Sequence, residues 1–157
     1  MEITQVQLEA LCELINIGVG QAANVLNTML ESHIKLQVPF LKVLTKDELL
    51  EEIKQICPER LAVVDLHFKG LFSGKAELIF PVAGASRLVE ALVGDIRAEQ
   101  HDIDSIRQGT ICEVGNIVIN AIMGSISNVL KTNFQYSVPL FAETVAEQLL
   151  SSNQQPS

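Results

Sequence analysis

Apolar residues recur every three or four positions in two long stretches of the chain. The first stretch follows Thr4 and Gln7, which have the spacing of a helix capping box, and it ends near Leu30. The second follows Asp104, a candidate helix cap, and ends near Lys131. This spacing is typical of helices that bury one face, so it predicts two long helices.

After each of these helices the period changes to two, which is typical of strands. The alternation covers 34–40 and 134–140, and Pro39 and Pro139 interrupt it, which indicates an edge position or a bulge. Residues 61–68 and 75–82 alternate around a Gly-Leu-Phe-Ser-Gly turn and predict a hairpin. Short helices are expected at 45–57, 86–93 and after Thr144, with a polar linker at 95–103.

A shift of 100 residues places the first long helix on the second. CELINI at 12–17 then falls on CEVGNI at 112–117, and both copies read Glu, two residues, Asn, 22 residues, Pro. At ordinary residue usage, about 150 residues contain roughly 0.3–0.5 Glu-x-x-Asn motifs by chance. Two such motifs in one register, each followed by the same Pro, indicate an internal duplication.

These patterns predict one domain over residues 1–157, of the α/β (α+β) class. Its expected architecture is two long helices packed on a mostly antiparallel sheet. Repeat one covers about 4–82, repeat two covers about 104–150, and 151–157 is a polar tail. The second repeat is shortened, because a counterpart of the 61–82 hairpin would lie beyond residue 157.

Four glycines, at positions 18, 20, 115 and 124, lie inside the predicted long helices. A glycine in a helix interior costs up to about 1 kcal/mol relative to alanine. We therefore expect another part of the backbone to approach the helices closely at these positions.

Charge and composition exclude several classes of function. Eleven Lys and Arg against 19 Asp and Glu give a net charge of −8, which disfavours nucleic acid and favours a partner protein with a basic surface. Three cysteines and three histidines lack metal-ligand spacing, so we expect reduced, buried thiols that act as small hydrophobic side chains, and no metal on this chain. No secretion signal and no run near 20 apolar residues are evident, so we expect a cytoplasmic protein without membrane insertion.

Each copy of the motif predicts a polar ridge that faces solvent beside the apolar stripe of its helix. Glu13 and Asn16 share a face in the first copy, and Glu113 and Asn116 share one in the second. The carboxylate attracts an ammonium group, whereas the planar amide both donates and accepts hydrogen bonds. They have no paired His, Ser or Cys with which to form a nucleophile and its activating base. A docked cation and a positioned water suit phosphoryl transfer, where catalysis is mostly positioning and electrostatics; the alternative is an ordinary solvated helix face.

The duplicated motif resembles the CheC/CheX chemotaxis phosphatases, and most closely CheC, in which both halves carry the site. The family pattern is Asp or Ser, three residues, Glu, two residues, Asn, 22 residues, Pro, and NIGVGQAA at 16–23 also resembles CheC. The resemblance covers about residues 4–142. It implies hydrolysis of the aspartyl phosphate of a phosphorylated CheY-like response regulator in chemotaxis signalling. Asn16 and Asn116 would orient the attacking water, and Glu13 and Glu113 would contact a lysine of the regulator.

The resemblance also implies that Mg²⁺ comes from the regulator, so no cofactor is expected on this chain. The deamidase CheD is a further candidate partner. The chain departs from the family pattern four residues before each Glu, where it has Glu9 and Gly109. Glu9 keeps an acidic side chain while Gly109 has none, so the sequence favours the first pair as the stronger site. Pro39 and Pro139 are expected to support the two sites.

Two other functions are compatible with the sequence. The first is a non-catalytic binding module, whose partner would be a phosphorylated regulator, a CheD-like deamidase or the flagellar switch. The second is an acidic dimerisation domain without a ligand. A homodimer is expected in any case, because the shortened second repeat leaves strand edges uncovered.

Overall fold

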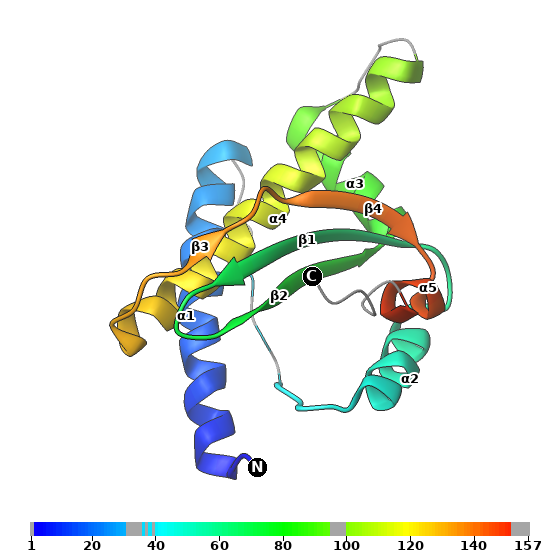
Figure 1. Cartoon of the computed structure of the whole chain (residues 1–157). Coiled ribbons are helices and arrows are strands. Elements are labelled where there is room, and N and C mark those ends of the chain that lie inside the picture. The colour runs from blue at the N-terminus through cyan, green and yellow to red at the C-terminus, as the bar shows by residue number, and fades with distance from the viewer. Residues whose placement is uncertain (1, 31–35, 37, 39, 95–99, 152–157) are drawn as a thin grey trace.

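The computed structural model describes residues 2–30, 36, 38, 40–94 and 100–151, and Figure 1 shows their arrangement. The elements are, in chain order, α1 (Gln5–Leu30), α2 (Lys46–Ile56), β1 (Leu61–Lys69), β2 (Ser73–Pro81), α3 (Val82–Val93), α4 (Gln100–Leu130), β3 (Gln135–Tyr136), β4 (Leu140–Thr144) and α5 (Ala146–Ser151). All strand pairs in this part of the chain are antiparallel. The predicted class, long helices with an antiparallel sheet, is confirmed.

Strand β1 is the centre of the sheet. It pairs with β2 along its whole length, from Leu61 opposite Pro81 to Lys69 opposite Ser73, so the predicted hairpin is confirmed. Its other edge pairs with β3 and then with β4. Because successive side chains alternate between faces, Leu61 and Val63 pack with residues of α2 and α5, whereas Ala62 and Val64 pack with residues of α3 and α4.

The two long helices lie against each other on one side of the sheet and run in opposite directions (Figure 1). Ala22 and Leu26 of α1 are buried with Val114 and Val118 of α4. At Gly18 the two backbones meet, since an added Cβ would lie 2.6 Å from the Ile122 Cα. This contact explains the glycine in the middle of a helix.

The predicted role of the helix glycines is confirmed at two of four positions. An added Cβ at Gly115 would lie 2.6 Å from Val64, so α4 rests directly on β1 there. At Gly20 and Gly124 an added Cβ would meet nothing within 4 Å in the part of the chain that the structure describes. The expectation of close approach is therefore wrong at these two positions, because they lie on the outer sides of their helices.

Two predicted helix starts are wrong. Helix α4 begins at Gln100 and not at Asp104, so its first turn lies in the segment expected to be a linker. The start of α4 extends beyond the sheet (Figure 1), and apolar periodicity best predicts the part of a helix that packs on a sheet. Helix α3 begins at Val82 instead of near residue 86, because Pro81 ends the strand and precedes the first helical residue.

The predicted strands after the long helices differ from the structure. The second is divided into β3 and β4, with Pro139 in the gap between them, as the proline indicated. In the first, the described positions 36, 38 and 40 are not in a strand, while 34 and 39 lie outside the described residues. The division of the chain into two repeats therefore stays a prediction. Most of the expected linker and tail, at 95–99 and 152–157, also lies outside the described part.

One described helix is long and apolar enough to cross a membrane by length and composition alone. This stretch, Ile103–Leu130, has a mean hydropathy of 1.3 in its most apolar window. Its Val114, Val118 and Ile119 are buried in the fold, which is the position of a core helix. The expectation that the chain has no stretch of this length and apolar composition is therefore wrong.

Helix α2 begins with a complete capping box, and this gives a first prediction. Thr45 Oγ1 accepts a hydrogen bond from the Glu48 N–H at 3.3 Å, and Glu48 Oε2 accepts one from the Thr45 N–H at 2.7 Å. Thr45→Ala is expected to destabilise the protein by about 1 kcal/mol in urea unfolding at pH 7. The matched control is Thr28→Ala, because the exposed Thr28 hydroxyl donates to the Asn24 carbonyl within its own helix and caps no helix start.

The effect of this substitution is also expected to depend on pH. The hydrogen bonds from the backbone and side chain of Thr45 lower the pKa of Glu48. Stability from a group with a lowered pKa is present above its unfolded pKa and is lost as the pH falls through the folded value. The difference between wild type and Thr45→Ala should therefore shrink in acid; a constant difference between pH 7 and pH 3 would contradict this.

Candidate phosphatase site

The first Glu-Asn pair lies in the N-terminal half of α1, just before Gly18, where α1 meets the backbone of α4. Glu13 is exposed, as expected for a docking carboxylate, but Asn16 is half-buried. The Asn16 side chain is held by the main chain of Val38: Oδ1 accepts the Val38 N–H at 2.8 Å, and Nδ2 donates to the Val38 carbonyl at 3.3 Å. A longer contact joins Nδ2 to Cys12 Sγ at 3.7 Å. The prediction of a wholly solvent-facing ridge is wrong at this position.

The second pair lies on α4 and is built differently. Glu113 is exposed and Asn116 is half-buried, as in the first pair. Asn116 Oδ1 accepts a hydrogen bond from Asn120 Nδ2 at 2.7 Å, one helix turn further on. In the part of the chain that the structure describes, Asn116 Nδ2 donates no hydrogen bond. The amide of the second pair therefore keeps donors for a ligand or a water.

A surface pocket of about 400 Å³ lies beside Glu113 of the second pair, and Asn116 is not among its lining residues. Glu113 lies at this pocket together with Gly109, and apolar side chains of α1, α3 and α4 form much of its wall: Met29, Leu92, Val93, Ile106 and Val114. The missing side chain at Gly109 leaves space beside the carboxylate, since an added Cβ would meet nothing within 4 Å among the described residues.

The two pairs lie at different levels along the helix pair. The contact of Gly18 with Ile122 fixes the register of the two antiparallel helices. At about 1.5 Å per residue, Glu13 and Glu113 then lie about 21 Å apart along the helices, and Asn16 and Asn116 lie about 12 Å apart. One phosphoryl group cannot contact both pairs, so any chemistry at one pair is independent of the other.

The residues expected to support the sites contact the pairs less directly. Glu9 is exposed one turn before Glu13, and its carboxylate accepts a hydrogen bond from Gln5 Nε2 at 3.0 Å. Pro39 lies outside the described residues, whereas Pro139 is half-buried between β3 and β4. Sequence reasoning did not assign a role to Val38 or Asn120; the spacing of four residues between Asn116 and Asn120 was the available signal for the second.

Comparison with known proteins shows which proteins this chain is similar to. A model described as the CheC-like family matches residues 6–43, the range that holds Glu13, Asn16 and Pro39. The chain is 26% identical over 159 aligned residues to a Bacillus subtilis protein named CheY-P phosphatase CheC, covering 97% of this chain and 76% of that protein. The resemblance to the CheC-like family is confirmed.

A second CheC-like relative is a longer protein. The Bacillus subtilis flagellar motor switch phosphatase FliY is 21% identical over 139 residues, which cover 88% of this chain but only 36% of FliY. This chain therefore corresponds to about a third of that relative.

Solved structures of chemotaxis proteins share the CheC-like fold. Thermotoga maritima FliY superimposes with a TM-score of 0.76 at 19% identity, covering 95% of this chain and 74% of that one. CheX, in the CheX–CheY–BeF₃–Mg²⁺ complex of Borrelia burgdorferi, superimposes with a TM-score of 0.59 at 19% identity over 93% of this chain and 85% of the other. The predicted fold is thus supported independently of the sequence motif.

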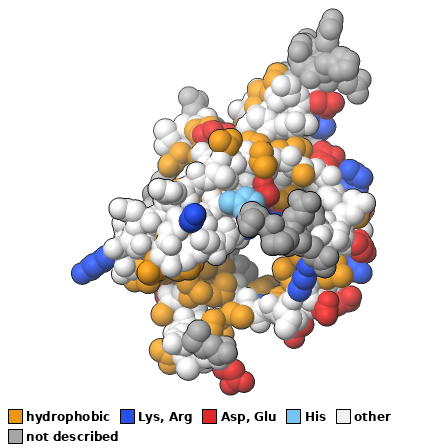
Figure 2. Space-filling model, in the orientation of Figure 1, with side chains coloured by type: hydrophobic (Ala, Val, Ile, Leu, Met, Phe, Trp, Pro, Cys, Tyr) orange, Lys and Arg blue, Asp and Glu red, His pale blue; other side chains and the backbone are white. Residues whose placement is uncertain are grey.

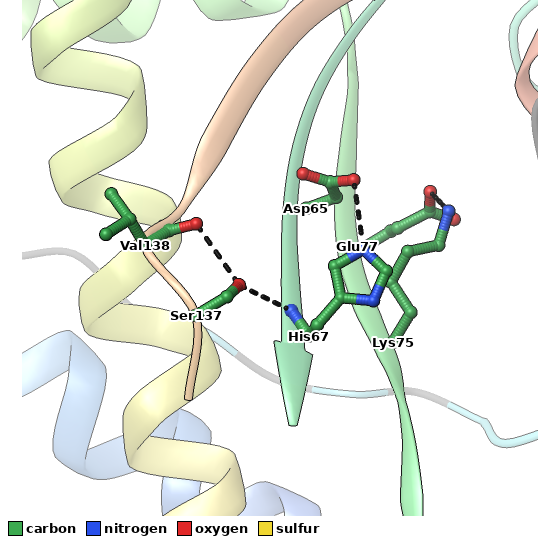
Figure 3. A network of polar contacts seen from close by, with 6 residues as sticks. All are labelled: Asp65, His67, Lys75, Glu77, Ser137 and Val138. Carbon is green, nitrogen blue, oxygen red and sulfur yellow. Dashed lines mark hydrogen bonds and ion pairs between the residues drawn. The ribbon is translucent and has the colours of Figure 1, made fainter. Parts of the chain in front are cut away.

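A set of Asp, His and Ser side chains on the sheet does not form a nucleophilic site (Figure 3). Ser137 Oγ accepts the backbone N–H of His67 at 3.0 Å and donates to the Val138 carbonyl at 3.2 Å, so it does not contact the imidazole. His67 Nε2 is 4.0 Å from Asp65 Oδ2, and the His67 side chain is 62% exposed. These contacts fasten the β3–β4 corner to β1 and activate no hydroxyl.

The cysteines do not supply a nucleophile either. The three thiols are free, and Cys57 is buried as predicted, but Cys12 and Cys112 are only half-buried, so the expectation of buried thiols is wrong at these two positions. Partial burial raises the pKa of the Cys112 thiol, and the negative charge of Asp65 raises it further, so this thiol stays protonated at neutral pH. Among the described residues, no three His, Cys, Asp or Glu side chains are grouped to hold a metal ion. The chemistry that the described residues favour is therefore positioning by the Glu-Asn pairs.

Proposed function

We propose that this chain hydrolyses the aspartyl phosphate of a CheY-type response regulator. The observation that carries the proposal is the geometry of the second pair. Glu113 is exposed beside a pocket, and the amide of Asn116, three residues further on, donates no hydrogen bond to another described residue. Two relatives are named as phosphatases, one of them for phosphorylated CheY, and a relative in fold is seen in complex with CheY. These names support the same substrate for this chain.

The chain contributes binding and water placement to this reaction. Glu113 or Glu13 attracts an ammonium group of the regulator, and the neighbouring Asn orients a water on the phosphorus. The water oxygen bonds to phosphorus as the bond from phosphorus to the aspartyl oxygen breaks, which releases inorganic phosphate and restores the carboxylate. Mg²⁺ belongs to the regulator in this proposal and neutralises charge on the phosphoryl group. The chain itself needs no cofactor.

The test is a phosphate-release assay with a purified CheY-type regulator that is phosphorylated by acetyl phosphate in the presence of Mg²⁺. Catalytic amounts of the chain should accelerate release over the regulator alone. Binding without acceleration would identify a non-catalytic module, which is the first of the two other functions compatible with the sequence. Association with a CheD-type deamidase and a cytoplasmic location stay predictions of the sequence.

A homodimer is a further part of the proposal. Strands β2 and β4 each have one edge without a partner strand in the described residues, and such edges favour pairing with another chain. Leu140 of β4 and the adjacent Val138 are 61% and 76% exposed. Sedimentation at micromolar concentration should show a species of twice the 17.2 kDa chain mass.

A charged residue on the β4 edge provides the control for assembly. Leu140→Lys should weaken the dimer, since lysines on edge strands oppose pairing. A wild-type protein that sediments as a monomer at these concentrations would contradict the proposal.

A further inference from the structure

The two Asn side chains differ in what holds them. Asn16 uses both ends of its amide on one residue, Val38, which lies 22 positions further along the chain. Asn116 is instead held through its carbonyl oxygen alone, by Asn120 on the next turn of its own helix. Asn16 Nδ2 contacts both the Val38 carbonyl and Cys12 Sγ, so it must give up one of these contacts before it can donate to a water, whereas Asn116 Nδ2 donates to no described residue and needs no such exchange.

The support from Asn120 has no counterpart in the first copy of the motif. The 100-residue register that aligns Asn16 with Asn116 places Gly20 opposite Asn120. Gly20 has no side chain, and an added Cβ there would meet nothing within 4 Å among the described residues. The first Asn is held across the fold by main-chain groups, and the second is held within its own helix.

We propose that Asn120 is a positioning residue for Asn116 and that the second pair carries most of the hydrolysis. This inference rests on the proposed phosphatase function and assigns different roles to its two Glu-Asn pairs. The Asn120 Nδ2 donor fixes the Asn116 oxygen, so that the amide nitrogen and the remaining lone pair of Asn116 have defined directions. A water placed by them needs little reorganisation before attack. Asn16 instead holds the main chain of Val38 against α1.

The surroundings of the second pair support the same division. The pocket of about 400 Å³ beside Glu113 offers room for a side chain of the regulator, and Gly109 keeps that side of the helix open. The sequence favoured the first pair because Glu9 replaces the acid of the family pattern. Glu9, however, is exposed and its carboxylate accepts a hydrogen bond from Gln5, one turn earlier on the same helix.

The first experiment measures kcat and KM of phosphate release for Asn120→Ala and Asn120→Asp. Aspartate has the shape of asparagine but no donor, so both variants should lower kcat about 3–10-fold, the value of one hydrogen bond, with KM nearly unchanged. Asn120→Gln retains an amide donor and should recover part of the loss. Gly20→Ala is the matched control at the equivalent position of the first copy and should leave kcat unchanged.

The second experiment does not depend on activity. Side-chain ¹⁵N relaxation of Asn116 should show a more mobile amide in Asn120→Ala than in wild type or Gly20→Ala. Backbone hydrogen exchange at Val38 should accelerate in Asn16→Ala, which removes the acceptor of its N–H, and should not change in Asn116→Ala.

The outcomes separate the two proposals. If the wild type hydrolyses no regulator phosphate, the proposed function fails, while the relaxation data still decide whether Asn120 holds Asn116. An Asn120→Ala variant with wild-type kcat, or with an equally ordered Asn116 amide, overturns the positioning role. A larger loss of turnover in Asn16→Ala than in Asn116→Ala, with the fold intact by circular dichroism, overturns the division between the sites.

Discussion

Replacing Asn16 and Asn116 together by alanine is expected to reduce phosphate release from a phosphorylated regulator by roughly 10²–10³-fold, because a positioned catalytic interaction is lost at both sites. Binding should weaken much less, since Glu13 and Glu113 still reach the regulator. The measurements are steady-state phosphate release and the affinity for the regulator carrying BeF₃⁻ and Mg²⁺. A double variant that retains the wild-type rate would refute catalysis by the pairs and leave the binding module.

Replacing the two carboxylates provides the contrasting variant. Glu13→Ala with Glu113→Ala should impair binding and turnover together, because these exposed side chains dock the helices on the regulator. Surface substitutions of this kind usually change stability by no more than about 0.5 kcal/mol. Asn16→Ala differs from the others, since it leaves the Val38 N–H and carbonyl without their partner and should cost roughly 0.5–1.5 kcal/mol.

The second large effect concerns the contact between the long helices. Gly18→Ala places a Cβ 2.6 Å from the Ile122 Cα and 2.8 Å from the Ala121 carbonyl oxygen, and backbone atoms cannot move aside as a flexible side chain can. Helices α1 and α4 must separate, so we expect a loss of about 1–3 kcal/mol in the free energy of unfolding. For a chain of this size, each kcal/mol corresponds to a Tm shift of about 2–4 °C.

Gly20→Ala is the matched control, two residues further along the same helix. Its added Cβ meets open space in the described part of the molecule, so the higher helix propensity of alanine should stabilise the protein by up to about 1 kcal/mol. Opposite signs for the two substitutions are the expected result in urea unfolding. Equal effects would show that α1 and α4 do not pack as described.

Local patterns in the sequence were sufficient for most of the elements. The Thr4–Gln7 spacing predicted the start of the first long helix, and a short helix was expected from residue 45; a capping box forms at both starts. Alternation on both sides of a glycine-containing turn predicted the β1–β2 hairpin. These features depend on residues within a few positions of one another, so their chemistry is visible in the linear chain.

The sequence also predicted the polar ridges, but it did not predict which of their side chains are already hydrogen-bonded within the fold. Helical spacing placed each Glu and Asn on one face, and the exposure of Glu13 and Glu113 agrees with that placement. It did not reveal that Asn16 is bonded to Val38, since this pair forms only when the chain returns to α1 after 22 residues. Which Asn keeps donors for a water is therefore decided by a contact between distant segments.

The relation between the two sites depended on the tertiary structure in the same way. The sequence determined two long helices, an antiparallel hairpin, a repeated Glu-Asn motif and a resemblance to chemotaxis phosphatases. Only the fold decided that α1 and α4 run in opposite directions and that Gly18 lies against the backbone of α4 while Gly20 meets nothing described. The same register places Glu13 and Glu113 about 21 Å apart along the helices. Periodicity reports which face of a helix is buried, and it carries no information on which distant segment covers that face.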